Sequence, residues 1–86
     1  MEVTYHSKFM KMYRRVPLKV QRKFELCISI FHRNPFDKRL ENHPLHGTWN
    51  GFRSIDITGD WRAIYLELGE TSAEFYAIGT HSQLYR

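Results

Sequence analysis

Residues that can move protons or bind phosphate are concentrated in the second half of the chain. They fall in the stretches "HPLHG", "SIDITGDWR" and "GTHSQLY", and they are His43, His46, Asp56, Asp60, Arg62, His81 and Tyr85. Histidine titrates near neutral pH and suits either proton role, and arginine stabilises charge that builds on a phosphate. Without a serine or cysteine nucleophile, such a set favours acid–base cleavage of RNA. The 2′-hydroxyl is then the nucleophile, and no metal or cofactor is required.

Three predicted strands must bring these groups together. "FRSIDI" alternates, with Arg53 on one face and Ser54 and Asp56 on the other. "TGD" predicts a turn in which Gly59 takes a positive φ, "WRAIYLEL" a second strand, and "AEFYAIG" a third that ends at Gly79. In such an antiparallel meander, we expect the residues at 60, 62 and 81 to converge at one end of the sheet.

Arg62 presents a conflict within this pattern. It shares strand parity with Ile64 and Leu66, so alternation directs it toward the same face as apolar residues. We expect the twist of the sheet at the first residues of the strand to resolve this conflict.

The first half of the chain predicts a strand and a helical hairpin. "VTYH" is a short strand, and "SKFMKMYRRV" has helical spacing with Ser7 as N-cap. Pro17 suits the first turn of a second helix, which ends at Asn34-Pro35 and carries an apolar stripe of Val20, Phe24, Cys27, Ile28 and Phe31. The result is an α+β fold with two helices on one sheet face and the other face open. The segment 37–51 is expected to be a loop.

Size and composition limit the alternatives. The 86 residues predict one domain, 1–86, with a net charge of +4 that suits an anionic partner such as nucleic acid or an acidic protein segment. The charge equally serves solubility alone. No apolar run is long enough to span a membrane, and the single Cys27 fits a reducing cytoplasm. His43 and His46 have H-x-x-H spacing, but no further ligand motif accompanies them, so a metal site is not expected.

The segment "HPLHGTWNGFRSIDITGDWRAIYLEL" and the ending "FYAIGTHSQLY" resemble RelE/ParE-superfamily toxins of bacterial toxin–antitoxin modules, especially the YafQ-like branch. That branch has a "HPL-x-G-x-W-x-G-Y/F-R" segment, then "DW" and "IY", and ends in "GTH" plus an aromatic residue. The resemblance covers the last half of the chain in sequence and the whole chain in element order. It implies a RelE-like fold, metal-independent cleavage of mRNA, usually in the ribosomal A site, and a cognate antitoxin as partner.

The resemblance also implies which residues act. By position, the branch's active groups fall on His43, Asp60, His81 and Tyr85. Asp56 departs from the branch, which has a histidine there. Arg62 departs too, since the branch is usually apolar at that position, but it matches the phosphate-stabilising arginine of RelE-type members.

These correspondences define the expected roles. We expect His81 to be the general acid and His43 the general base, oriented by Asp60 or Asp56, although acid and base could be exchanged. Arg62 would stabilise the phosphorane, and Tyr85 would stack on or position a base. The remaining candidate RNA contacts are Arg53, Trp61 and His46. Asp60 is equally well explained as a turn residue, and Trp61 as part of the core or its rim.

Other functions compete with this hypothesis. A ParE-type toxin of the same scaffold would bind DNA gyrase without needing a His–Asp–His set. A module that only binds an acidic protein or RNA would tolerate alanine at His43, Asp60 and His81. A family member inactivated by Asp56 is a third alternative. Because the chain is basic, its antitoxin should present an acidic segment, and their binding should weaken as salt rises.

Overall fold

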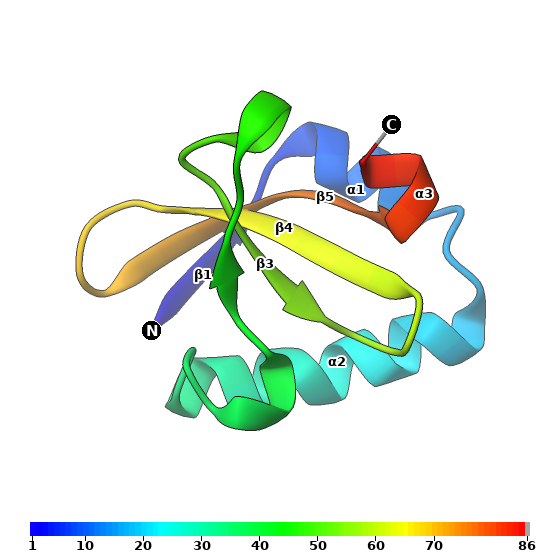
Figure 1. Ribbon diagram of the computed structural model, residues 1–86. Coiled ribbons are helices and arrows are strands. Elements are labelled where there is room, and N and C mark those ends of the chain that lie inside the picture. The colour runs from blue at the N-terminus through cyan, green and yellow to red at the C-terminus, as the bar shows by residue number, and fades with distance from the viewer. Residues whose placement is uncertain (86) are drawn as a thin grey trace.

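A five-stranded sheet with the strand order β1-β5-β4-β3-β2 organises the chain. The computed structural model describes residues 1–85, and Figure 1 shows α2 lying along one side of the sheet. The strands are β1 (Glu2–Tyr5), β2 (His43–Pro44), β3 (Arg53–Asp56), β4 (Trp61–Glu67) and β5 (Ser72–Thr80). The predicted β3-β4-β5 meander and the α+β class are confirmed. At one edge β1 pairs parallel to β5, which makes the sheet mixed.

Two helices cover one face of this sheet, as predicted. They are α1 (Ser7–Tyr13) and α2 (Leu18–Arg33). The stripe on α2 buries Phe24, Cys27, Ile28 and Phe31 in a core shared with Tyr65 and Phe75 of the sheet. Phe31 is 0% exposed, and its ring meets those of Tyr65 and Phe75 edge-on. Burial of this stripe, at roughly 1.5–3 kcal/mol per large side chain, fixes which face of the sheet the helices occupy.

The ends of the helices differ from prediction in detail. His6, not Ser7, is the N-cap of α1, because its Nδ1 accepts a hydrogen bond of 3.1 Å from the Lys8 amide. Pro17 lies immediately before α2 rather than in its first turn, and Asn34 ends the helix as expected. The side chain of Gln21 joins the two helices, because its Nε2 donates to the Tyr13 carbonyl oxygen at 2.8 Å.

The opposite face of the sheet was expected to be open, and this prediction is only half right. A second, smaller apolar cluster of Leu45, Ile64, Ala77 and Leu84 covers its middle. Leu84 belongs to α3 (His81–Leu84), a helix that the sequence did not predict. The part of this face that the cluster leaves uncovered therefore lies where β3 ends and β4 begins, beside β2.

Two glycine predictions are wrong. Gly79 does not end the third strand, since β5 continues to Thr80 and Gly79 pairs with Arg62. A side chain at this position would meet α3, because a Cβ there would lie 3.0 Å from Gln83 Oε1. Gly59 does not have the positive φ that was expected for its turn.

The segment 37–51 was expected to be a loop but is partly ordered. It contains two 3-10 helices, η1 (Lys38–Leu40) and η2 (Gly47–Trp49), with β2 between them. Leu40 is 0% exposed and anchors η1 in the core. Because β2 adds to the edge of the sheet at β3, this segment delivers His43 to the accessible face.

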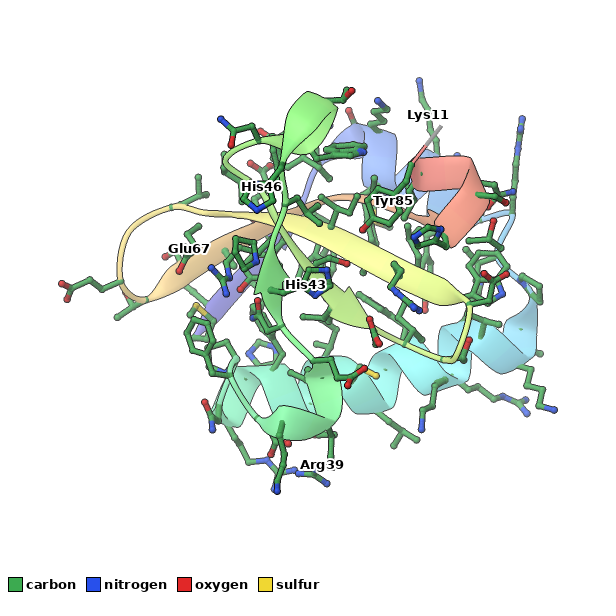
Figure 2. All side chains as sticks on the ribbon, viewed as in Figure 1. Lys11, Arg39, His43, His46, Glu67 and Tyr85 are labelled. Carbon is green, nitrogen blue, oxygen red and sulfur yellow. The ribbon has the colours of Figure 1, made fainter. Side chains whose placement is uncertain are left out.

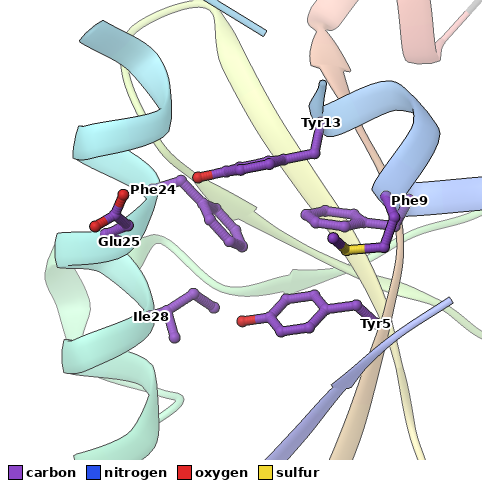
Figure 3. A pocket seen from close by; sticks show the side chains of 7 residues that line it. Tyr5, Phe9, Tyr13, Phe24, Glu25 and Ile28 are labelled. Carbon is purple, nitrogen blue, oxygen red and sulfur yellow. The ribbon is translucent and has the colours of Figure 1, made fainter. Parts of the chain in front are cut away.

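An apolar pocket of about 300 Å³ opens between β1, α1 and α2. Figure 3 shows it lined by aromatic rings and Ile28, with the Glu25 carboxylate at its side. It lies on the helical side and contains none of the candidate site residues. Within residues 1–85, no helix has the length and hydropathy needed to cross a membrane.

Candidate functional site

The strand register places several predicted residues in two adjacent rows. His43 of β2 pairs with Ser54 of β3, and Asp56 of β3 pairs with Arg62 of β4. Paired residues of antiparallel strands project to the same face, and so do residues two apart on one strand. His43, Ser54, Asp56 and Arg62 therefore share the face opposite α1 and α2. Figure 2 shows His43 in front of β3 and β4.

This arrangement resolves the conflict over Arg62. Ile64 does lie on the same face as Arg62, but it is buried by the second apolar cluster rather than by α2. Simple alternation is thus obeyed without help from sheet twist. Because β4 is buried on both faces, an apolar residue such as Ile64 does not indicate which face of the sheet Arg62 occupies.

The imidazole of His43 is oriented by the main chain. Its Nδ1 lies 2.8 Å from the Glu41 carbonyl oxygen. A carbonyl only accepts hydrogen bonds, so Nδ1 must carry the hydrogen. In the neutral ring the lone pair is then on Nε2, which is the atom available to take a proton. Asp60 or Asp56 was expected to orient this ring, and the Glu41 main chain does so instead.

Arg62 is held by several contacts at the start of β4. Its Nε forms an ion pair with Asp56 Oδ1 at 2.9 Å, and its Nη1 donates to the Thr58 and Trp61 carbonyl oxygens. Both side chains of the Asp56–Arg62 pair are mostly buried, with 21% and 17% exposed. Within residues 1–85, Nη2 has no hydrogen-bond partner, so it is the part of the guanidinium that can reach a phosphate oxygen.

Asp56 lies among charges of both signs. Burial raises the pKa of its carboxyl, and a hydrogen bond shared with the Glu41 carboxyl raises it further, against the opposing effects of Arg62 and His43. The sequence predicted that an aspartate here could not donate a proton at neutral pH. This environment makes Asp56 better able to hold a proton than an ordinary aspartate.

His81 and Tyr85 reach the same end of the sheet through α3. Thr80 begins this helix with a capping box, in which its side chain and that of Gln83 bond each other's backbone amides. The His81 amide donates to the Asp60 carbonyl at 3.0 Å, which ties α3 to the β3–β4 turn. The exposed His81 ring meets the Tyr85 ring edge-on, with centroids 4.7 Å apart.

The Tyr85 hydroxyl donates to Ser54 Oγ at 3.2 Å. Ser54 is 0% exposed and stands between the His43 and Asp56 positions on this face. Tyr85 therefore fastens the last helix to β3, in addition to any contact with a base. Asp60 is exposed, and its main chain rather than its carboxylate makes the contact with His81.

Three predicted RNA contacts lie elsewhere. Arg53 pairs with Tyr65 on the helical side, donates to Asn42 Oδ1 at 2.8 Å and lies over the Phe36 ring. Trp61 packs against the main core, on the face opposite Arg62. His46 is exposed at the residue before η2, outside the aligned rows. The structure does not bring these three residues together with His43 and Arg62.

A groove of about 640 Å³ lies along α2 and is lined by both apolar and charged side chains, among them Glu41 and Asp56. Its basic side chains include Lys23 and Arg33, both exposed. Arg39 also lines it but is paired with Asp37 at 2.9 Å. Within residues 1–85, no three histidine, cysteine or acidic side chains are grouped as metal ligands.

Sequence reasoning missed Glu41, Ser54 and Thr80. Ser54 carried a usable signal, since it shares strand parity with Asp56. Thr80 with Gln83 matches the capping-box spacing and could have predicted α3. Nothing in the sequence marked Glu41, because its contribution comes from a backbone conformation.

Comparison with known proteins agrees with this arrangement. The model of the bacterial toxin YafQ of type II toxin–antitoxin systems matches residues 1–86. The mRNA interferase toxin YafQ of Escherichia coli is 32% identical over 63 residues, which are 73% of this chain and 67% of that protein. A crystal structure of Escherichia coli YafQ has a TM-score of 0.81 at 22% identity and covers 99% of this chain and 98% of that one.

A complex of YafQ with DinJ from Escherichia coli is also similar. Its matching chain has a TM-score of 0.68 at 26% identity and covers 99% of this chain and 98% of that one. The predicted resemblance is thus confirmed over the full length, including the half in which no motif was found. The chain belongs to the YafQ family of bacterial toxins from type II toxin–antitoxin systems.

Proposed function

We propose that this toxin is an endoribonuclease that cleaves mRNA by attack of the 2′-hydroxyl, with His43 as general base and His81 as general acid. The observation that carries the proposal is the hydrogen bond from His43 Nδ1 to the Glu41 carbonyl. It leaves Nε2 as a proton acceptor on the accessible face. The name of the Escherichia coli relative, an mRNA interferase, supports the same substrate class.

The reaction needs two proton transfers and no protein nucleophile. His43 Nε2 takes the proton of the 2′-hydroxyl while the 2′-oxygen forms a bond to phosphorus. The bond from phosphorus to the 5′-oxygen breaks, and protonated His81 supplies the proton that this leaving oxygen requires. The products are a 2′,3′-cyclic phosphate and a 5′-hydroxyl, and both histidines exchange protons with water before the next turnover.

Arg62 lies between the two histidines in the strand order and is suited to the phosphate. Its Nη2 can donate to an oxygen of the pentacoordinate phosphorane, where charge builds. Its other nitrogens are held by Asp56 and by two carbonyls, so it needs little reorganisation during the reaction. The groove bearing Lys23 and Arg33 offers a path for the RNA backbone that leads to Asp56.

Partners and setting follow from the family. A toxin of this type has a cognate antitoxin, and the complex of DinJ with YafQ supports such a partner here. With a net charge of +4, residues 1–86 as one toxin domain suit an acidic antitoxin segment and an RNA substrate. We place its action in the cytoplasm on mRNA held by the ribosome, where cleavage stops translation.

The test is cleavage of a defined mRNA by the purified chain, with and without ribosomes. Wild type should give fragments with 2′,3′-cyclic phosphate and 5′-hydroxyl ends. His43→Gln and His81→Gln should each reduce the rate about 100-fold or more. Because both side chains are exposed, neither change should lower the melting temperature appreciably.

His46→Gln is the matched control, since it removes an exposed histidine outside the aligned rows. It should retain the wild-type rate. Growth arrest by His43→Gln and His81→Gln without new mRNA ends would contradict the enzyme and indicate a bound target such as gyrase.

A further inference from the structure

The chain segment just before β2 has an unusual backbone. Glu41 has φ 49° and ψ 43°, and among residues 1–85 it is the one non-glycine residue with a positive φ. Side chains other than glycine, asparagine and aspartate seldom adopt this left-handed conformation, because Cβ approaches a carbonyl oxygen. A glutamate is kept in it only where surrounding contacts compensate for the strain.

Those contacts are present on both sides of Glu41. Before it, Leu40 is fully buried, and the Glu41 amide donates to the Lys38 carbonyl at 3.2 Å. The Asp37 carboxylate caps η1 and binds the Arg39 guanidinium. After it, β2 pairs with β3. The turn at Glu41 is therefore the joint between an anchored 3-10 helix and the strand that carries His43.

The turn determines where the Glu41 carbonyl points. Because the chain turns at Glu41, this carbonyl oxygen lies 2.8 Å from Nδ1 of His43, which follows two residues later. The Glu41 carboxyl lies within hydrogen-bonding reach of Asp56, so the same residue also borders the partner of Arg62. Main chain and side chain of Glu41 thus contact two different parts of the site.

We propose that Glu41 is a positioning residue of the site, whose left-handed turn holds the His43 ring with its hydrogen on Nδ1 and its lone pair on Nε2. The proposal rests on the ribonuclease function proposed above and adds to it the device that sets the tautomer of the base. Glu41 touches no substrate in this scheme. It acts through His43.

Substitutions at Glu41 separate the turn from the carboxyl. Glu41→Gly removes the carboxyl and accepts a positive φ without strain. Glu41→Val removes the same carboxyl but disfavours that φ, since it is β-branched. Glu41→Gln keeps the side-chain size and removes the charge. Because Glu41 is exposed, the variants should fold, and the Gly variant controls for loss of the carboxyl.

The direct readout is the tautomer of each histidine, obtained from nitrogen-15 NMR of the full chain at about pH 8, where imidazoles are neutral. His6 is an internal control, because its Nδ1 accepts from the Lys8 amide and its hydrogen must therefore be on Nε2. His43 should show the opposite form, with the hydrogen on Nδ1. It should keep this form in Glu41→Gly and lose it in Glu41→Val.

Cleavage rates should follow the tautomer. We expect Glu41→Val to be slower by about 10- to 100-fold, as for a misplaced catalytic group, and Glu41→Gly to stay within about threefold of wild type. A His43 signal like that of His6 in wild type, or equal rates and tautomers in Glu41→Val and Glu41→Gly, would overturn the proposal.

The NMR readout separates this proposal from the function on which it rests. If wild type cleaves no RNA but His43 changes tautomer only in Glu41→Val, the positioning role stands and the ribonuclease function fails. If wild type cleaves RNA and the tautomer does not respond to position 41, the function stands and the positioning role fails.

Discussion

At the scale of single residues, the ion pair of Asp56 and Arg62 is central to the proposed mechanism. The carboxylate holds the guanidinium in place through Nε, and in doing so it partly neutralises the charge that a phosphate would seek. Proton uptake by Asp56 relieves this competition. We therefore expect the protonation state of Asp56 to alter the affinity of Arg62 for a phosphate.

Replacing Arg62 tests whether its planar fork matters. Arg62→Lys keeps the charge but cannot pair with Asp56 while it donates to the two carbonyls and to a phosphate. We expect the cleavage rate to fall about 100-fold, comparable to removal of one preorganised donor. Arg53→Lys is the control, because that arginine lies on the other face and binds Asn42. A similar fall in both variants would argue against a specific role for Arg62.

Asp56 should also make stability depend on pH. Burial, together with the Glu41 carboxyl, raises its pKa in the folded protein, so the folded state binds a proton more readily than the unfolded chain. Its contribution is therefore fully present below the unfolded pKa of about 3.9 and is lost as pH rises through the higher folded pKa. Urea unfolding of wild type and Asp56→Asn across this range should show that the free energy of unfolding of wild type falls relative to that of the variant as pH rises. A wild type that instead gained stability relative to Asp56→Asn as pH rises would contradict the raised pKa.

At the scale of elements, α3 carries His81 and packs closely against Gly79 of β5. His81 and Tyr85 are positioned because Thr80 caps the helix and because Leu84 and Gln83 pack closely over Gly79. The helix has only four residues, too few to be stable in isolation. Its geometry therefore depends on tertiary contacts.

Gly79→Ala tests that dependence. The added Cβ would lie 3.0 Å from Gln83 Oε1 and 3.3 Å from Leu84 Cδ2, so these two side chains of α3 must move by a few tenths of an ångström, at a cost of about 1–3 kcal/mol. We expect a lower melting temperature and a slower cleavage rate. Gly59→Ala should change neither, because its Cβ would meet nothing within 4 Å and its φ is not positive. If Gly79→Ala changed the melting temperature and the cleavage rate as little as Gly59→Ala, the position of α3 would not depend on its contacts with Gly79.

At the scale of the whole molecule, the two faces of the sheet have different tasks. The helical face holds the main core and provides stability, while the other face combines a small apolar cluster with the reactive groups. The groove along α2 lies between them, since both Lys23 of α2 and Asp56 of β3 line it. RNA bound along it would approach His43 from the edge of the sheet.

Salt dependence of RNA binding tests this path. Lys23→Gln and Arg33→Gln should each weaken single-stranded RNA binding and reduce the slope of log affinity against log salt by about 0.7. Lys11→Gln in α1 removes the same charge away from the groove (Figure 2) and should leave the slope nearly unchanged. If all three variants gave the same slope, the RNA would be attracted by net charge rather than by the groove.

Much of the fold and part of the site could be predicted from the sequence. Helical periodicity identified the buried stripe of α2, and alternation identified β3 and β4, because these local periods reflect burial directly. Convergence of Asp60, Arg62 and His81 followed from meander topology, and contacts link the Asp60 main chain to His81. The placement of Trp61 on the core side agrees with the alternative reading of that residue, not with a role in RNA binding.

The sequence by itself thus determined the class of fold and the family resemblance, because both depend on residue types and their spacing. Only the tertiary structure decided which face Arg62 occupies, what orients His43, and that β5 runs on through Gly79 into α3. These features depend on contacts between segments distant in sequence and on one strained turn at Glu41. Burial on both faces of β4 and the left-handed backbone of Glu41 produce no periodic pattern of residue types, so the sequence does not indicate them.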